Sequence, residues 1–120
     1  KMANAFRMTN KASVGTSLTT IYTCPDDTTS VVIGIMCSNT SSASVNASIK
    51  LNSSTSNTTN TGQSGSNTNC FIVKDVPIQD STSLEIMSGN KIVLQEGDVI
   101  QLQSSGASSL DIIISYMEMT

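Results

Sequence analysis

The stretch SGNKIVLQEGDVIQLQSSG, from Ser88 to Gly106, decides the fold of this chain. It begins with turn residues, continues into the apolar run KIVL, and passes through EGD into VIQLQS, where apolar and polar residues alternate. A period of two places the apolar side chains on one face of a β-strand. The stretch therefore predicts two short strands joined by a tight turn, with Gly97 supplying the turn.

Similar short segments recur along the chain, and none shows the i, i+3, i+4, i+7 spacing of a helix. Most connections are too short for crossover helices, which favours antiparallel pairing. We therefore predict an all-β fold, a jelly-roll-like antiparallel β-sandwich of about eight strands over residues 16–120. The expected strands are SLTTIYT (17–23), SVVIGIMCS (30–38), ASVNASIKL (43–51), CFIVKDVPI (70–78), TSLEIM (82–87), KIVL (91–94), VIQLQS (99–104) and LDIIISYMEM (110–119).

Three of these segments carry positional information. The nearly continuous apolar run of residues 30–38 predicts a strand that is buried on both faces or lies at the centre of a sheet. Pro77 lacks a backbone donor, so the end of its strand is expected at an edge or corner. In the last strand, Ile112, Ile114 and Tyr116 share one face, and Ile113, Met117 and Met119 share the other with Asp111 and Ser115.

Two segments fall outside this pattern. Residues 1–15 lack sustained periodicity and predict an extended N-terminal arm, either a disordered tail or an arm ordered only against a neighbouring subunit. Residues 52–69, NSSTSNTTNTGQSGSNTN, contain no apolar side chain and predict a long surface loop. That loop is either a flexible hairpin tip or a contact site.

Composition narrows the classes of function. Charged residues make up 12% of the 120 residues, the net charge is −3, and aromatic residues make up 3%. A weakly acidic chain with few aromatic side chains for base stacking is expected to bind nucleic acid poorly. The shortage of aromatic side chains also disfavours sugar binding. No segment reaches the roughly 18 apolar residues of a membrane span, and the start KMANAFRMTNKASVG lacks the apolar core of a signal peptide. We expect neither nucleic acid nor membrane as a partner.

Catalytic and metal-binding patterns are weak. The chain has no histidine, and Cys24, Cys37 and Cys70 match no zinc spacing, so they are expected to be small buried hydrophobes, although one disulfide plus a free thiol stays open. The acidic turns at Asp26–Asp27 and at Glu96–Asp98 offer oxygen ligands for Ca²⁺ or are simply solvated acids. We predict no enzyme activity, no cofactor and no metal site.

The quoted segments resemble a known group of proteins. The stretches TTIYTCPDDTTSVVIGIMCSNTSSASVNASIKL and VKDVPIQDSTSLEIMSGNKIVLQEGDVIQLQSSGASSLDIIISYMEM are similar to a family of small virion structural proteins of tailed phages, especially those of marine and cyanobacterial hosts. The resemblance covers about Thr19 to Thr120, and its motifs are structural. It implies a β-sandwich in a symmetric assembly on a phage particle, and it carries over no catalytic residues.

Two functions follow from this resemblance. The first is a capsid decoration (cement) protein in the virion, assembled in the host cytoplasm, that binds the major capsid protein and forms a homotrimer. The alternative is a tail, neck or fibre-associated protein whose 52–69 loop contacts a host receptor. For the first function, the predicted interface residues are Phe6, Arg7 and Met8 of the arm, with Met117 and Met119 as a subunit interface or as ordinary core residues.

Overall fold

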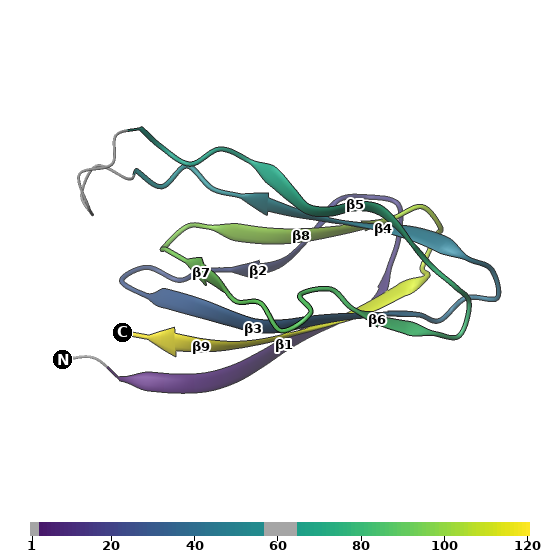
Figure 1. Cartoon of the computed structure of the whole chain (residues 1–120), viewed down its shortest axis with the longest axis horizontal. Coiled ribbons are helices and arrows are strands. Elements are labelled where there is room, and N and C mark those ends of the chain that lie inside the picture. Colours follow the sequence, from purple (N-terminus) through teal and green to yellow (C-terminus); the bar gives the residue numbers. More distant parts are fainter. Residues whose placement is uncertain (1–2, 57–64) are drawn as a thin grey trace.

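A computed structural model describes residues 3–56 and 65–120 of the chain. Two antiparallel sheets stack face to face, and no helix occurs in these ranges (Figure 1). The predicted all-β sandwich is therefore confirmed. The strands of the described ranges are β1 (Asn4–Val14), β2 (Thr19–Thr23), β3 (Thr29–Asn39), β4 (Val45–Asn52), β5 (Cys70–Ile78), β6 (Ser83–Glu85), β7 (Ile92–Leu94), β8 (Val99–Ser104) and β9 (Leu110–Met119).

The strands divide between the sheets in a jelly-roll order. Sheet I has the order β1-β9-β3-β6, with β7 also paired to β3, and sheet II has the order β2-β8-β4-β5. Successive strands from β1 to β4 alternate between the sheets, and so do β7, β8 and β9. The last strand of the chain therefore lies inside sheet I, between β1 and β3.

The stretch from Ser88 to Gly106 crosses from one sheet to the other. Its first strand, β7, pairs with β3 of sheet I, and its second, β8, pairs with β2 and β4 of sheet II. Gly97 lies between them with φ = +86°, a conformation that favours glycine, and its N–H donates to the Cys24 carbonyl at 2.9 Å. The predicted tight turn is therefore present, and it joins the two layers.

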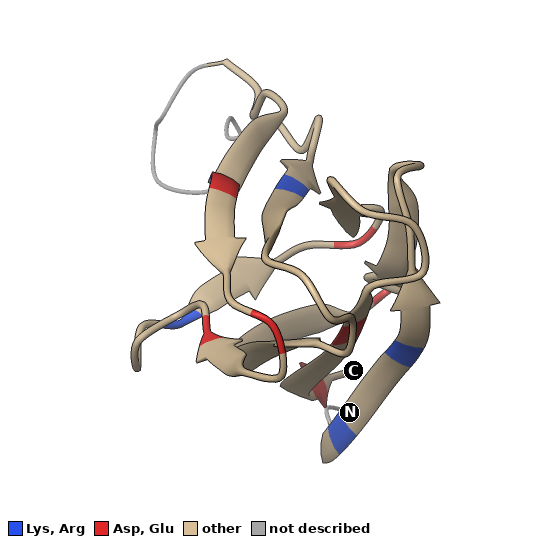
Figure 2. Ribbon diagram, turned by 90° about the vertical axis from the view of Figure 1, so that its right-hand side faces the viewer, with Lys and Arg blue, Asp and Glu red and all other residues tan. Residues whose placement is uncertain are grey.

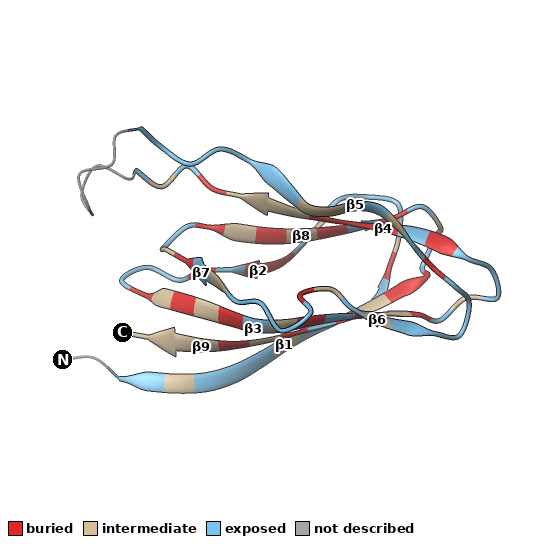
Figure 3. Cartoon of the chain, viewed as in Figure 1, coloured by how far each residue is buried: buried red, intermediate tan, exposed pale blue. Residues whose placement is uncertain are grey.

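The core lies between the layers, where alternate residues of each strand point inward (Figure 3). Leu110, Ile112 and Ile114 of β9 are completely buried, as are Ile100 and Leu102 of β8. Two aromatic rings, those of Tyr22 and Tyr116, are also buried there. Aliphatic side chains therefore form most of the core, as the low aromatic content requires.

For β3, the prediction of burial on both faces is wrong, and the alternative, a strand at the centre of a sheet, is confirmed. The strand lies at the centre of sheet I, but it is not buried on both faces, since Ile33 and Met36 are exposed. A register shift between Val32 and Gly34 inserts one extra residue into the alternation of inward and outward side chains. Val32 and Ile35 therefore both point into the core, although they are three residues apart. The apolar run therefore supplies the core on one side and an uncovered apolar surface on the other.

The prediction of an N-terminal arm that is disordered or ordered only against a neighbouring subunit is also wrong. Residues 4–14 form β1, an edge strand of sheet I that pairs along its length with β9 of the same chain. Over most of its length the large apolar side chains, Phe6 and Met8, face outward, while Ala5, Arg7 and Thr9 occupy the inner positions. Val14, at the end of the strand, is buried in the core. This pattern, the reverse of an amphipathic core strand, is the reason that periodicity did not predict it.

The long polar loop is described in part. Its first residues after β4 and its last residues before β5 are held together by a bridge between Ser56 and Ser66, while residues 57–64, the centre of the predicted contact loop, lie outside the described residues. At the base of the loop, the buried Asp98 carboxylate accepts hydrogen bonds from Ser53 Oγ (2.6 Å) and Thr55 Oγ1 (2.9 Å). The base of the loop is therefore tied to the β7–β8 turn.

The cysteines differ in exposure. Cys24 and Cys37 are buried free thiols, as predicted for small hydrophobes. Cys70 is exposed, which corrects the prediction for that residue. It begins β5, the edge strand of sheet II, where it is not covered by a second layer. Pro77 lies in the same edge strand, as predicted.

Candidate functional site

The outer face of sheet I is the candidate site. On β9, Ile114 points into the core and is completely buried, while its neighbour Ile113 points outward and is 43% exposed. Apolar side chains also occupy outward positions of β1, β3 and β7, with Phe6 78% exposed and Val93 58% exposed. The large exposed apolar side chains of this face are Phe6, Met8, Ile33, Met36, Val93 and Ile113.

Strand pairing aligns these side chains in rows across the sheet. Phe6 pairs with Met117, Met117 pairs with Val31, and Val31 pairs with Val93, so one row crosses β1, β9, β3 and β7. Directly paired residues have Cβ atoms about 4.5–5.5 Å apart and point to the same face. The row is therefore a continuous apolar strip that spans the whole sheet.

A second row lies further along the strands. Ile113 pairs with Asn10 on one side and with Met36 on the other, and Met36 pairs with Glu85 of β6. A shallow cavity of about 130 Å³ lies beside Ile113, between β9 and β3, and Gly34, Met36 and Glu85 contribute to its wall. Gly34, which has no side chain, and Ser115, which has a small one, leave this hollow between the two rows.

Glu85, the charged residue in the wall of this hollow, already has hydrogen-bond partners within the chain. The Glu85 carboxylate accepts hydrogen bonds from the backbone N–H groups of Ile35 (3.1 Å), Met87 (2.7 Å) and Ser88 (2.7 Å). A carboxylate held by three backbone donors fixes the loop after β6. It therefore has a structural role at the rim of the apolar face.

The structure brings together four of the five predicted interface residues. Phe6 and Met117 are paired neighbours in the first row, and Met8 and Met119 occupy outward positions on the same two strands. Arg7 lies on the opposite side of β1, where its Nε donates to Glu118 at 2.8 Å. Phe6, Met8, Met117 and Met119 therefore share the outer face of sheet I and Arg7 does not, and their role as an interface stays a prediction.

Sequence reasoning missed the remainder of the face. Val31, Ile33 and Met36 lie in the apolar run for which the sequence predicts either burial on both faces or a place at the centre of a sheet. Val93 lies in a three-residue strand. The useful signal is the alternation of β9, which places Ile113 on the face of Met117 and Met119 and opposite to Ile112 and Ile114.

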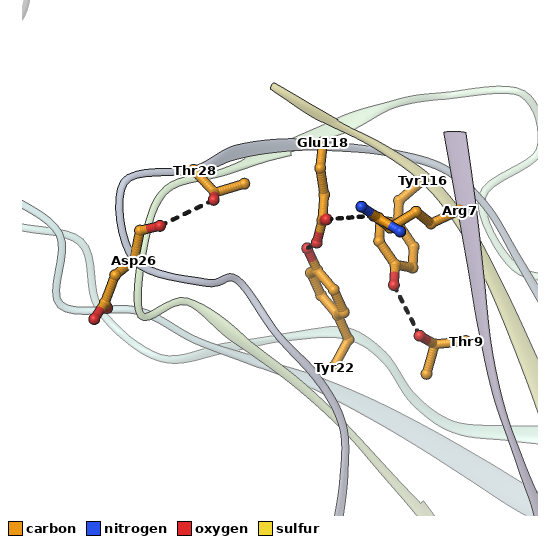
Figure 4. Close-up of polar contacts among 7 residues, drawn as sticks. All are labelled: Arg7, Thr9, Tyr22, Asp26, Thr28, Tyr116 and Glu118. Atoms are coloured by element: carbon orange, nitrogen blue, oxygen red, sulfur yellow. Dashed lines mark hydrogen bonds and ion pairs between the residues drawn. The ribbon is translucent and has the colours of Figure 1, made fainter. Parts of the chain in front are cut away.

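A polar cluster closes one end of the sandwich beneath this face (Figure 4). Tyr22 of sheet II donates to Glu118 Oε2 of sheet I at 2.6 Å, and the Tyr22 and Tyr116 rings lie 4.3 Å apart at 44°. The Tyr116 hydroxyl and Thr9 Oγ1 are hydrogen-bonded at 2.8 Å. Burial, and then the hydrogen bond to Glu118, raise the pKa of Tyr22 well above its ordinary value of 10.0. The cluster therefore keeps a neutral phenol against a carboxylate and joins the two sheets.

The two acidic turns, which were considered separately as Ca²⁺ ligands, are neighbours. Asp27 N–H donates to Glu96 Oε1 at 3.3 Å, and Asp98 is buried with its oxygens accepting from Ser53, Thr55 and the Gln95 N–H. Asp98 is thus a buried hydrogen-bond acceptor and not a solvated acid. Within residues 3–56 and 65–120, no group of three or more His, Cys, Asp or Glu side chains could hold a metal ion. The same residues contain no helix long and apolar enough to cross a membrane.

Comparisons with known proteins show the fold. No family model and no curated protein matches this chain. Among solved structures, a protein from work on Bacillus endospore appendages, described as a novel family of disulfide-linked pili, is similar over 99% of this chain and 88% of its own, with 12% identity and a TM-score of 0.50. A chain of the T13 particle of infectious bursal disease virus (IBDV) is similar over 97% of this chain and 30% of its own, with 8% identity and a TM-score of 0.52.

A chain of the Gx strain of the same virus is similar over 99% of this chain and 31% of its own, again with 8% identity and a TM-score of 0.52. The present chain therefore spans about a third of the length of these viral chains. At such low identity, the three likenesses show a shared β-sandwich architecture.

Proposed function

We propose that this protein is a non-enzymatic structural component of a virus particle, a decoration (cement) protein that binds the outer shell through the outer face of sheet I. The observation that carries the proposal is the apolar strip Phe6–Met117–Val31–Val93, which crosses four strands and is covered by no element of the described chain. Scattered exposed apolar residues are ordinary, but a contiguous set on one face indicates an interaction surface.

The physical character of this face suits many weak contacts. The strip that crosses it consists of aliphatic, aromatic and methionine side chains, and methionine adapts to irregular partner surfaces. Burial of such a patch contributes free energy in proportion to the apolar area removed from water. Each contact can be weak when several copies bind one particle together. Decoration of a repeating shell needs this kind of interaction.

The similar solved structures support the same class of function. Two of them come from a virus particle and one from an appendage made of pili, so the architecture occurs in assemblies of repeated subunits. The cysteines favour the particle over a disulfide-linked filament. Cys24 and Cys37 are buried, which leaves Cys70 as the exposed thiol. One accessible thiol links two copies, whereas a covalent filament needs at least two accessible thiols in each subunit.

The test uses particles produced from the genome that encodes this chain, made without the protein and then incubated with it. Met117→Asp places a charge in the apolar strip, and Asn46→Asp places the same charge at an exposed position of β4 in sheet II. We expect the wild type and Asn46→Asp to bind at high copy number over the shell in electron microscopy, and Met117→Asp to lose binding. Density confined to the tail would contradict decoration and support the tail-associated alternative. Equal binding by the two variants would contradict the assigned face.

A further inference from the structure

β1 has the one long free edge of sheet I in the described part of the chain. It pairs with β9 on one side and with no described strand on the other. The opposite edge of this sheet is formed by β6 and β7, which have three residues each. In sheet II, β2 has five residues, and β5 contains Pro77 and a left-handed Asp75 (φ = +53°). Short strands, prolines and irregularities protect an edge from further pairing, whereas β1 contains no proline and its pairing with β9 is regular from Asn4 to Lys11.

The backbone groups on this free edge are known from the pairing with β9. Ala3 and Thr120 exchange both backbone hydrogen bonds, each at 3.0 Å. In an antiparallel ladder, hydrogen-bonded and non-hydrogen-bonded positions alternate. The backbone groups of Ala5, Arg7 and Thr9 therefore point to β9. Those that point to the free edge belong to Asn4, Phe6, Met8 and Asn10.

We propose that β1 pairs antiparallel with β1 of a second copy of this chain, about a two-fold axis that passes through Met8. Met8 then lies opposite Met8 of the second copy, and Phe6 lies opposite Asn10. The N–H and C=O groups of these three residues form hydrogen bonds in both directions, because each of them points to the free edge. The regular paired region within β1 covers residues 5–11 of both strands, because the register shift with β9 begins after Lys11.

The positive charges of β1 favour the register with the axis at Met8 over the two registers next to it. β1 carries Arg7 and Lys11 and no acidic residue, and in Figure 2 the strand that begins near the N label has blue positions and no red one. An axis at Arg7 places this residue against its own copy, and an axis at Thr9 places Arg7 against Lys11. Like charges directly opposite each other destabilise a strand pair. With the axis at Met8, Arg7 faces Thr9 and Lys11 faces Ala5, so no like charges are opposed.

Two further registers avoid like charges but pair less backbone. An axis at Phe6 limits the overlap to the first part of β1. An axis at Asn10 extends the overlap to Ser13, which has a left-handed φ of +58° and lies within the register shift between Lys11 and Val14. An irregular residue interrupts ladder pairing. The register at Met8 is therefore the longest regular one.

The pairing has a consequence for the outer face of sheet I. Sheet I becomes one continuous sheet across the two copies, with β1 of each copy at its centre. Phe6, which ends the apolar strip of each copy, and Met8, which is also exposed in the single chain, then lie at the junction of the two copies. This inference does not depend on the proposed function, because the pairing requires the free edge alone.

Cysteine cross-linking of the full chain tests the register in a Cys70→Ser background, which removes the exposed native thiol. Met8→Cys places two thiols opposite each other at a Cα separation of about 5.5 Å, within the range of a disulfide. Asn10→Cys is the matched control on the same strand, since the two copies of this position lie four residues apart along the pair, about 14 Å. We expect a disulfide-linked dimer for Met8→Cys under mild oxidation and none for Asn10→Cys. Equal cross-linking of the two variants would overturn the register.

Sedimentation of the unmodified chain and of Met8→Pro tests the pairing itself. Proline removes an N–H that points to the free edge and leaves the β1–β9 hydrogen bonds intact, so the variant should fold as the wild type does. We expect a concentration-dependent dimer for the wild type and a monomer for Met8→Pro, with closely similar circular dichroism spectra. A wild type that is monomeric over the whole concentration series would overturn the proposal, and so would a dimer that persists in Met8→Pro. Neither measurement uses a particle, so its failure is distinct from failure of the decoration function.

Discussion

Tyr22 of β2 donates its phenolic hydrogen to Glu118 of β9 across the gap between the two sheets, at 2.6 Å. The same carboxylate accepts from Arg7 of β1 through its other oxygen at 2.8 Å. One side chain therefore connects sheet II to the two neighbouring strands at the edge of sheet I (Figure 4).

The two partners of Glu118 should differ in their contribution to stability. Tyr22→Phe removes a buried donor and leaves a largely buried carboxylate oxygen unpaired, so we expect the free energy of unfolding to fall by about 1–3 kcal/mol. The Arg7 side chain is 57% exposed, so Arg7→Met should cost less than ~1 kcal/mol. Urea unfolding of the two variants gives both values. An equal cost for both would contradict the assignment of the buried bond as the stronger one.

Stability should decrease steeply at alkaline pH. Burial, and then the charge of Glu85, raise the pKa of the Cys37 thiol from its ordinary value of 9.0 to about 12. Between these values the unfolded chain releases the proton and the folded chain keeps it, so the free energy of unfolding falls as pH rises, by at most about 1.4 kcal/mol per pH unit for this group. Tyr22 adds a decrease of the same sign above pH 10.0, because its pKa is also raised in the folded chain.

Urea titrations between pH 9 and pH 12 measure this effect. Cys37→Val should give a shallower decrease than the wild type, whatever its effect on stability at neutral pH. Cys70→Ser removes an exposed thiol and is the control for the loss of a thiol in general. A Cys37→Val profile parallel to that of the wild type would show that this thiol does not stay protonated in the folded chain.

The adjacent residues Ile113 and Ile114 should respond very differently to truncation. Ile114 is completely buried, so Ile114→Ala should cost about 2–5 kcal/mol through lost burial and a residual cavity. Ile113 faces outward, so Ile113→Ala should change stability by no more than ~0.5 kcal/mol. Thermal unfolding of both variants measures the two losses of stability. Comparable losses would mean that the outer face of sheet I is covered within the chain.

Gly97 is predicted to be sensitive because of its conformation and not because of its surroundings. A Cβ atom at this position would meet no atom within 4 Å, but its φ of +86° is one that other residues rarely adopt. Gly97→Val should therefore destabilise the protein by more than ~1 kcal/mol, whereas Gly97→Asn should cost less because asparagine tolerates left-handed conformations better. The order of the two melting midpoints is the measurement, and the reverse order would contradict the conformational explanation.

Alternation predicted most of the sandwich because core strands must bury one face. It identified β9 and β8 and the separation of Ile113 from Ile114. It failed for β1, whose inner positions hold Arg7 and Thr9, because there the register with β9 and the hydrogen bonds to Glu118 and Tyr116 define the strand, and neither is visible in local sequence. The bulge in β3 is equally invisible, and it reverses the expected exposure of Met36.

The candidate surface could be predicted only in part for the same reason. Met117 and Met119 are two residues apart on one strand, so the sequence places them on the same face. Their neighbours Val31 and Val93 come from strands that are distant in sequence. An apolar residue in a short strand does not reveal whether a second layer covers it. The strip became visible only when the pairing order placed the strands side by side.

The position of β9 between β1 and β3 also constrains how the chain can fold during synthesis. Asn4 is paired with Met119, so β1 lacks its partner in sheet I until β9 has been made. β3 likewise lacks one of its neighbours until then. Closing such long loops is entropically costly and slows folding. Sheet I should therefore form after translation has passed residue 119, and nascent chains halted earlier should be open to proteases along β1.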